Sequence, residues 1–166
     1  MKYLTEARKI IEGSVRKDLK TALATNSLNF AGLYCSCFND HKASYDYARQ
    51  ALIEFDKNIK RLEDIEISKS VEDVRKSSNE KIIKQHYKFL VKAQIKVADE
   101  NFHLGNFQKW KEDYEKSFEL IKKHFGLDSM LFKKYCRKYE KTMKKIGSKK
   151  DITVNSHNND LKNSSS

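Results

Sequence analysis

The sequence predicts an all-α protein, and three observations lead to that fold class. The 166 residues contain no proline and only five glycines, so few positions would interrupt a helix. Apolar residues recur at spacings of three and four along most of the chain, which is the period of one face of an α-helix. Asn-Asp and Gly-Asn pairs separate these periodic stretches. Together these features favour antiparallel helices joined by short turns.

We expect six helices in order along the chain. The first is short, covers residues 2–12, and ends before Gly13 and Ser14. Each of the other five carries an apolar stripe with helical spacing, and these stripes lie within residues 15–37, 45–62, 83–104, 107–121 and 131–146. Two of the helices are unusually long, over residues 41–66 and 80–104.

The predicted breaks fall where turn-forming residues occur. Asn39-Asp40 and Gly105-Asn106 each separate two stripes, and Gly126 ends the helix before Asp128 or Ser129 starts the next. Residues 68–80 are mostly polar without a clear period, which indicates a mobile connector. We therefore predict one helical domain over residues 1–147, followed by a disordered polar tail over residues 148–166.

The chain also contains an internal repeat with an offset of 66 residues. Under this shift Gly32 aligns with Ala98, and the turn at residues 39–40 aligns with the turn at 105–106. His41 aligns with Phe107, the first ring after the turn. A small residue in the first helix lets the second helix approach closely, which is the packing expected of a helical hairpin.

This pattern resembles the tetratricopeptide repeat (TPR) family. The stretch LNFAGLYCSCFNDHKASYDYARQAL places Gly32, the turn at 39–40 and the pair Ala51-Leu52 where that family has a small residue, a turn and an Ala-Leu pair. The second copy ends in KKHFGLDS before a new helix, which is similar to the longer repeats of kinesin light chains. The resemblance implies TPR-like stacked antiparallel hairpins with a C-terminal capping helix, and a groove that binds a peptide or helix.

The resemblance also implies which helices line this groove, namely the first helix of each hairpin. We expect polar or amphipathic side chains there to contact the bound peptide: Asn26, Asn29, Tyr34, Lys84, Gln94 and Asn101.

Positive charge gathers near the C-terminal end of the chain. The net charge is +11, and residues 133–150 hold nine Lys/Arg against one Glu. This basic patch is formed by Lys133, Lys134, Arg137, Lys138, Lys141, Lys144 and Lys145. A terminal capping helix with a solvated outer face explains this pattern, and so does a binding surface for anionic partners.

Metal and enzymatic chemistry find no support in the sequence. Cys35 and Cys37 point about 200° apart on a helix, so they cannot share one metal ion, and His41 falls at a packing position. No phosphate-binding glycine loop, HExxH motif or nucleophile elbow occurs. We therefore expect no metal site, no cofactor and no enzymatic activity.

These observations favour a non-enzymatic adaptor or scaffold that binds another protein. The alternative is a basic tether to nucleic acid or to an acidic protein surface through residues 133–150, with nucleic acid the less favoured partner. No apolar run is long enough to span a membrane, and the N-terminal sequence lacks the pattern of a signal peptide. We expect a cytoplasmic protein, with a cytoskeletal or ciliary setting suggested by the family resemblance. Because two hairpins make a short array, docking onto a partner or self-association is also expected.

Overall fold

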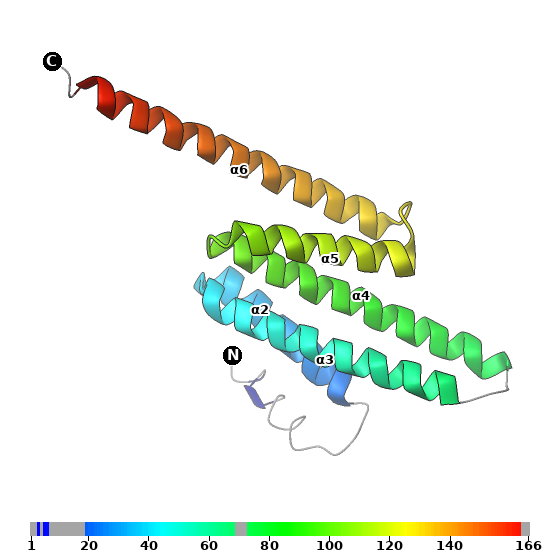
Figure 1. Cartoon of the computed structure of the whole chain (residues 1–166). Coiled ribbons are helices and arrows are strands. Elements are labelled where there is room, and N and C mark those ends of the chain that lie inside the picture. The colour runs from blue at the N-terminus through cyan, green and yellow to red at the C-terminus, as the bar shows by residue number, and fades with distance from the viewer. Residues whose placement is uncertain (1–2, 4, 7–18, 69–72, 164–166) are drawn as a thin grey trace. The chain divides into compact units, whose positions relative to one another are not determined.

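The structure is a computed structural model that describes residues 3, 5–6, 19–68 and 73–163 (Figure 1). Its helices are α2 (Leu19–Phe38), α3 (His41–Ser68), α4 (Asp73–His103), α5 (Phe107–Phe125) and α6 (Met130–Asn163). No strand occurs in the described ranges, so the predicted all-α class is confirmed there. The short helix predicted over residues 2–12 lies largely outside the described residues.

The chain divides into two compact units, Met1–His124 and Phe125–Ser166. The single domain that the sequence predicts over residues 1–147 stays a prediction. Helix α6 continues to Asn163, where the sequence predicts a disordered tail from residue 148. A single internal glycine, Gly147, costs a helix only about 1 kcal/mol and no proline follows it, so nothing in the sequence forces α6 to end there.

The three predicted turns occur where the sequence places them. Asn39, Gly105 and Gly126 have positive φ angles of 52°, 78° and 84°, the left-handed conformation that ends helices. The next helices are capped by side chains. The Asp40 carboxylate accepts the N–H three residues later at 2.9 Å, and the Ser129 hydroxyl oxygen does the same at 3.2 Å. Local backbone chemistry therefore fixes these breaks.

The predicted connector over residues 68–80 is shorter in the structure. Helix α3 ends at Ser68 and α4 already begins at Asp73, so residues 73–80 are helical. This segment is polar and lacks an apolar period, but it contains neither glycine nor proline. Because nothing in this stretch breaks a helix, the backbone can be helical without an apolar stripe, which is why periodicity misses the first turns of α4.

Helices α2 to α5 lie side by side, and each runs antiparallel to the one before it (Figure 1). Helix α3 packs against α2 on one side and α4 on the other, and α4 also packs against α5. Phe55 of α3 stacks on Phe89 of α4 with ring centroids 5.5 Å apart. Tyr87 of α4 donates a hydrogen bond to Glu63 of α3 at 2.6 Å. The long α3–α4 pair therefore forms the centre of this unit.

The close contact between α2 and α3 is made by Ala31 and not by Gly32. Ala31 is fully buried in a cluster with Ala48 of α3 and Val97 of α4. The Ser44 hydroxyl of α3 donates a buried hydrogen bond to the Ala31 carbonyl at 2.7 Å, which shows how near the two helices lie. A Cβ atom on Gly32 would have no heavy atom within 4 Å. The expectation that Gly32 lets the helices nest is therefore wrong by one residue.

The second hairpin uses large side chains at the positions that match these small ones. Under the offset of 66 residues, Ser44 and Ala48 align with Trp110 and Tyr114 of α5, which are 1% and 0% exposed. The two rings contact each other with centroids 5.5 Å apart, and the Tyr114 hydroxyl donates to Asp99 of α4 at 3.1 Å. Ala98, the other predicted small residue, is fully buried as expected. The repeat therefore keeps its topology while its packing differs.

Substitutions at the neighbouring positions 31 and 32 test this contact. Ala31→Leu forces extra volume into a packed site and should lower the free energy of unfolding by about 1–3 kcal/mol. Gly32→Ala removes a glycine from a helix without a clash, so it should raise that free energy by about 0.5–1 kcal/mol. Chemical denaturation followed by circular dichroism measures both effects. A loss of stability in Gly32→Ala would show that residue 32 makes the close contact.

Candidate functional site in a groove between three helices

A groove with a volume of about 1240 Å³ runs between α3 and α5, with α4 at its floor. Its apolar lining consists of Leu52 and Ile53 of α3, Leu90 of α4 and Leu120 of α5. Leu90 is buried, whereas 46% of the Ile53 surface is exposed. The groove therefore presents apolar side chains to solvent along a channel bounded by three helices.

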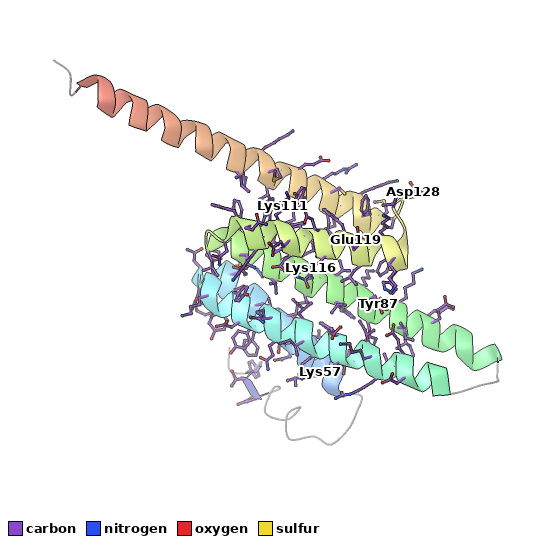
Figure 2. The ribbon with its side chains drawn as sticks, viewed as in Figure 1. Lys57, Tyr87, Lys111, Lys116, Glu119 and Asp128 are labelled. Carbon is purple, nitrogen blue, oxygen red and sulfur yellow. The ribbon has the colours of Figure 1, made fainter. Side chains whose placement is uncertain are left out.

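Charged residues form the two rims of this groove. Helix α3 contributes Asp56, Lys57 and Lys60, and α5 contributes Glu112, Glu115, Lys116, Glu119, Lys122 and Lys123. Figure 2 labels Lys57 on α3 and both Lys116 and Glu119 on α5. Some of these charges are paired within their own helix. Lys60 lies 2.8 Å from Asp56, and Lys57 lies 3.1 Å from Glu54. Such exposed pairs contribute little to stability and can exchange partners.

The charges are unevenly distributed along the groove. Because α3 and α5 both run antiparallel to α4, they are parallel to each other, and their later turns lie at the same end (Figure 1). Lys57 and Lys60 of α3 and Lys122 and Lys123 of α5 lie in those later turns. Glu112 and Glu115 lie in the earlier turns of α5. Lys116 and Glu119, of opposite charge, lie between these two groups, so one end of the groove has more cations and the other more carboxylates.

A hydrogen-bonded carboxylate joins the groove floor to α5. Asp113 of α5 accepts one hydrogen bond from the Gln94 amide at Oδ1 and one from the Asn101 amide at Oδ2, each at 2.9 Å. Burial raises the pKa of Asp113, and the opposing effects of Asn101, Lys116 and Gln94 do not cancel that rise. Both amides are buried, so Asp113 satisfies donors that would otherwise lack a partner inside the α4–α5 contact.

The six predicted groove residues are not gathered at one place. Gln94 lines the groove, and Asn101 lies deeper in the α4–α5 contact. Lys84 is exposed on α4. On α2, Asn26 is buried, Asn29 is exposed and Tyr34 stacks on Tyr47 with centroids 5.3 Å apart. The groove is lined by α3, α4 and α5, whereas the sequence reasoning places it on α2 and α4.

Two apolar residues outside the helical stripes could have indicated this groove. The apolar stripe of α3 includes Leu52 and Phe55, and that of α5 includes Phe118 and Ile121. Ile53 and Leu120 lie beside these stripes, yet both line the groove. An apolar residue beside its helix's buried stripe widens the apolar surface toward a neighbouring helix. Two such residues on two helices could have indicated a shared exposed apolar surface.

The predicted basic patch lies on α6. All seven of its residues, Lys133, Lys134, Arg137, Lys138, Lys141, Lys144 and Lys145, are exposed in that helix. Lys133 lies within the first turn, where its N–H donates to the Ser129 carbonyl at 3.1 Å. The helix therefore presents a dense row of cations over about four turns.

Comparison with known proteins identifies no relative: no family model, curated protein or solved structure matches this chain. Within the part of the chain that the structure describes, no helix is both long enough and apolar enough to cross a membrane.

Removing the Asp113 carboxylate tests its structural role. Asp113→Ala leaves the buried Gln94 and Asn101 amides without their acceptor and should cost about 1–3 kcal/mol of unfolding free energy. Glu112→Ala, at the exposed neighbouring position, should change stability by less than about 0.5 kcal/mol. Chemical denaturation measures the two variants. Equal stability of both would contradict a supporting role for Asp113.

Comparison of the wild type with Asp113→Ala also tests the raised pKa of Asp113. The folded state binds this carboxyl's proton more tightly than the unfolded state, so wild-type stability should rise relative to Asp113→Ala as pH falls from neutral toward 3.8. Denaturation at several pH values measures this difference. A difference that is constant with pH would contradict the shift.

Proposed function

We propose that this chain is a non-enzymatic adaptor that binds an amphipathic helix of another protein in the groove between α3, α4 and α5. The observation that carries the proposal is an open apolar channel with charged rims, formed by three helices of one unit. Amphipathic helices bind such channels through apolar side chains that recur every three or four residues.

The size of the groove supports a helical partner. Its volume of about 1240 Å³ exceeds the roughly 300–1,000 Å³ of most small-molecule pockets. Its lining on α5 extends from Glu112 to Lys123, which at 1.5 Å per residue is about 16 Å, or three helical turns. A partner helix of three to four turns would place two or three apolar side chains over Ile53, Leu90 and Leu120.

The charges along the rims favour one direction for the bound helix. Acidic residues are favoured in the first turn of a helix and basic residues in its last turn, because of the helix dipole. A helix with that common pattern would put its acidic N-terminal end beside Lys57, Lys60 and Lys122, and its basic C-terminal end beside Glu112 and Glu115. The partner would then run antiparallel to α3 and α5, in the same direction as α4.

The resemblance to the TPR family is separate support for a binding role. TPR-like proteins present stacked helical hairpins whose grooves take peptides or helices. The proposed groove differs from the one this resemblance implies, because α3 and α5 are the second helices of their hairpins. We therefore rest the proposal on the groove itself, with the resemblance as support for protein binding in general.

The exposed cations of α6 favour one alternative, a basic tether to nucleic acid or to an acidic protein surface. Seven cations on one helix attract a polyanion strongly at low salt and weakly at high salt. Apolar contacts in a groove persist at moderate ionic strength, because they do not depend on long-range charge attraction. Salt dependence therefore separates the two functions.

Two matched isoleucines provide the test of groove binding. Ile53 lines the groove and is 46% exposed, whereas Ile82 of α4 is 45% exposed and does not line it. The full chain is screened against a displayed library of amphipathic helices, and the selected peptides are titrated against each variant by fluorescence anisotropy. Ile53→Glu should weaken binding at least tenfold, because it places a charge among the apolar contacts. Ile82→Glu should leave binding unchanged.

Other outcomes of this titration would overturn the proposal. Equal binding by wild type, Ile53→Glu and Ile82→Glu would show that the groove is not the binding site. Binding that falls steeply with salt, and is lost when Lys133, Lys134, Arg137 and Lys138 are replaced by Gln, would support the tether instead.

A further inference from the structure

Three side chains with metal-ligating atoms meet where α2 ends and α3 begins. Cys35 lies in the last turn of α2, His41 is the first residue of α3, and Glu100 lies in the last turn of α4. One ligand atom from each residue lies within 4.8 Å of the other two. His41 Nδ1 is 2.7 Å from Glu100 Oε2. The fold therefore brings together three groups that the sequence separates by up to 65 residues.

Glu100 is an ionised carboxylate in the interior. Its side chain is fully buried. The Lys96 ammonium and a ring nitrogen of His41 each lie against one of its two oxygens, and an adjacent cation favours the ionised form. A buried carboxylate of this kind requires a cation beside it, since an unpaired charge in the interior is very costly.

The cation now beside Glu100 is the ammonium group of Lys96. Its Nζ lies 2.6 Å from Glu100 Oε1. The ammonium is therefore held by one of the three groups that could ligate a metal ion. Because 20% of the Lys96 side chain is exposed, this long and flexible chain can leave the cluster for solvent.

The ring of His41 is held in place by a second imidazole. His103 of α4 stacks on it with centroids 4.2 Å apart and an interplanar angle of 1°. A group that fixes the plane of a histidine ring also fixes the direction of its nitrogen lone pair, as outer partners of metal-bound histidines do.

We propose that Cys35, His41 and Glu100 form a binding site for a Zn²⁺ ion, which replaces the Lys96 ammonium. Sulfur, imidazole nitrogen and carboxylate oxygen are the ligand types that Zn²⁺ takes in proteins, and a water molecule would complete a tetrahedral site. On binding, the Cys35 thiol releases its proton to solvent, the proton on His41 Nδ1 is exchanged through solvent for one on Nε2, and Lys96 moves outward. The negative charges of the Cys35 thiolate and the Glu100 carboxylate then balance the two positive charges of the ion.

The adjustments required are small. Bond lengths of about 2.0–2.3 Å place tetrahedral ligand atoms about 3.4–3.6 Å apart. The His41–Glu100 pair must therefore open from 2.7 Å by somewhat less than 1 Å. The other ligand atoms lie within 4.8 Å of one another, so each pair must close by at most about 1.4 Å. Rotations about side-chain bonds supply such movements. The site lies among the ends of three helices, so an ion there would join α2, α3 and α4.

The test uses the full chain, reduced and freed of metal with a chelator. Co²⁺ serves as a spectroscopic probe, and Zn²⁺ affinity is measured by competition with a chromophoric chelator. Co²⁺ should produce a thiolate-to-cobalt absorption band that Cys35→Ser abolishes and Cys37→Ser retains; Cys37 is exposed two residues farther along α2. Cys35→Ser and His41→Ala should each weaken Zn²⁺ binding at least tenfold. Lys96→Met should tighten it about tenfold, because the competing cation is removed.

Lys96→Met should bind Zn²⁺ more tightly, whereas the ligand variants should bind it more weakly. A misfolded protein would not bind more tightly, so this variant separates loss of a ligand from misfolding. A cobalt band that persists in Cys35→Ser, equal Zn²⁺ affinity in Cys35→Ser and Cys37→Ser, or the absence of saturable binding by the wild type would each overturn the proposal.

Discussion

The packing of α3 against α4 is the constraint on which the rest of this fold depends. The contact runs from Ala48 with Val97, in the early turns of α3 and the late turns of α4, through the Phe55–Phe89 stack. It reaches Glu63 near the end of α3 and Tyr87 at the middle of α4. Helix α2 packs on α3, and α5 packs on α4. Each hairpin contributes one helix to this central pair, so the α3–α4 contact joins the two hairpins. In helical repeat proteins each repeat likewise contacts only its neighbours.

Both proposed sites follow from the central position of α4. Toward α5 it presents Gln94 and Asn101, which bind Asp113 beneath the groove. Toward α2 and α3 it presents Lys96 and Glu100, which meet His41 and Cys35. A helix covered on several sides must pair its polar groups with partners on its neighbours, because unpaired buried groups are costly. The polar residues within the α4 sequence therefore mark contacts that specify how the helices are arranged.

The sequence predicts the features that depend on local chemistry. The turns at Asn39, Gly105 and Gly126 follow from residues that accept a left-handed backbone, and the helices follow from their apolar stripes. It misplaces features that depend on how the helices are rotated and offset. Ala31 and Gly32 differ by about 100° around α2, so a shift of one residue decides which of them meets α3. The groove and the Cys35–Glu100 cluster each combine residues from three helices, and no local pattern encodes that combination.

Amide hydrogen exchange tests the central role of the α3–α4 contact most directly. Proteins open in cooperative units whose exchange reports the stability of each unit. If this contact holds both hairpins in place, the backbone amides of the α3 and α4 residues at this contact should exchange more slowly than all other amides in the chain. They should lose protection together in increasing denaturant. Loss of protection in α2 and α3 at a denaturant concentration where α4 and α5 keep theirs would contradict it, because the hairpins would then be separate folding units.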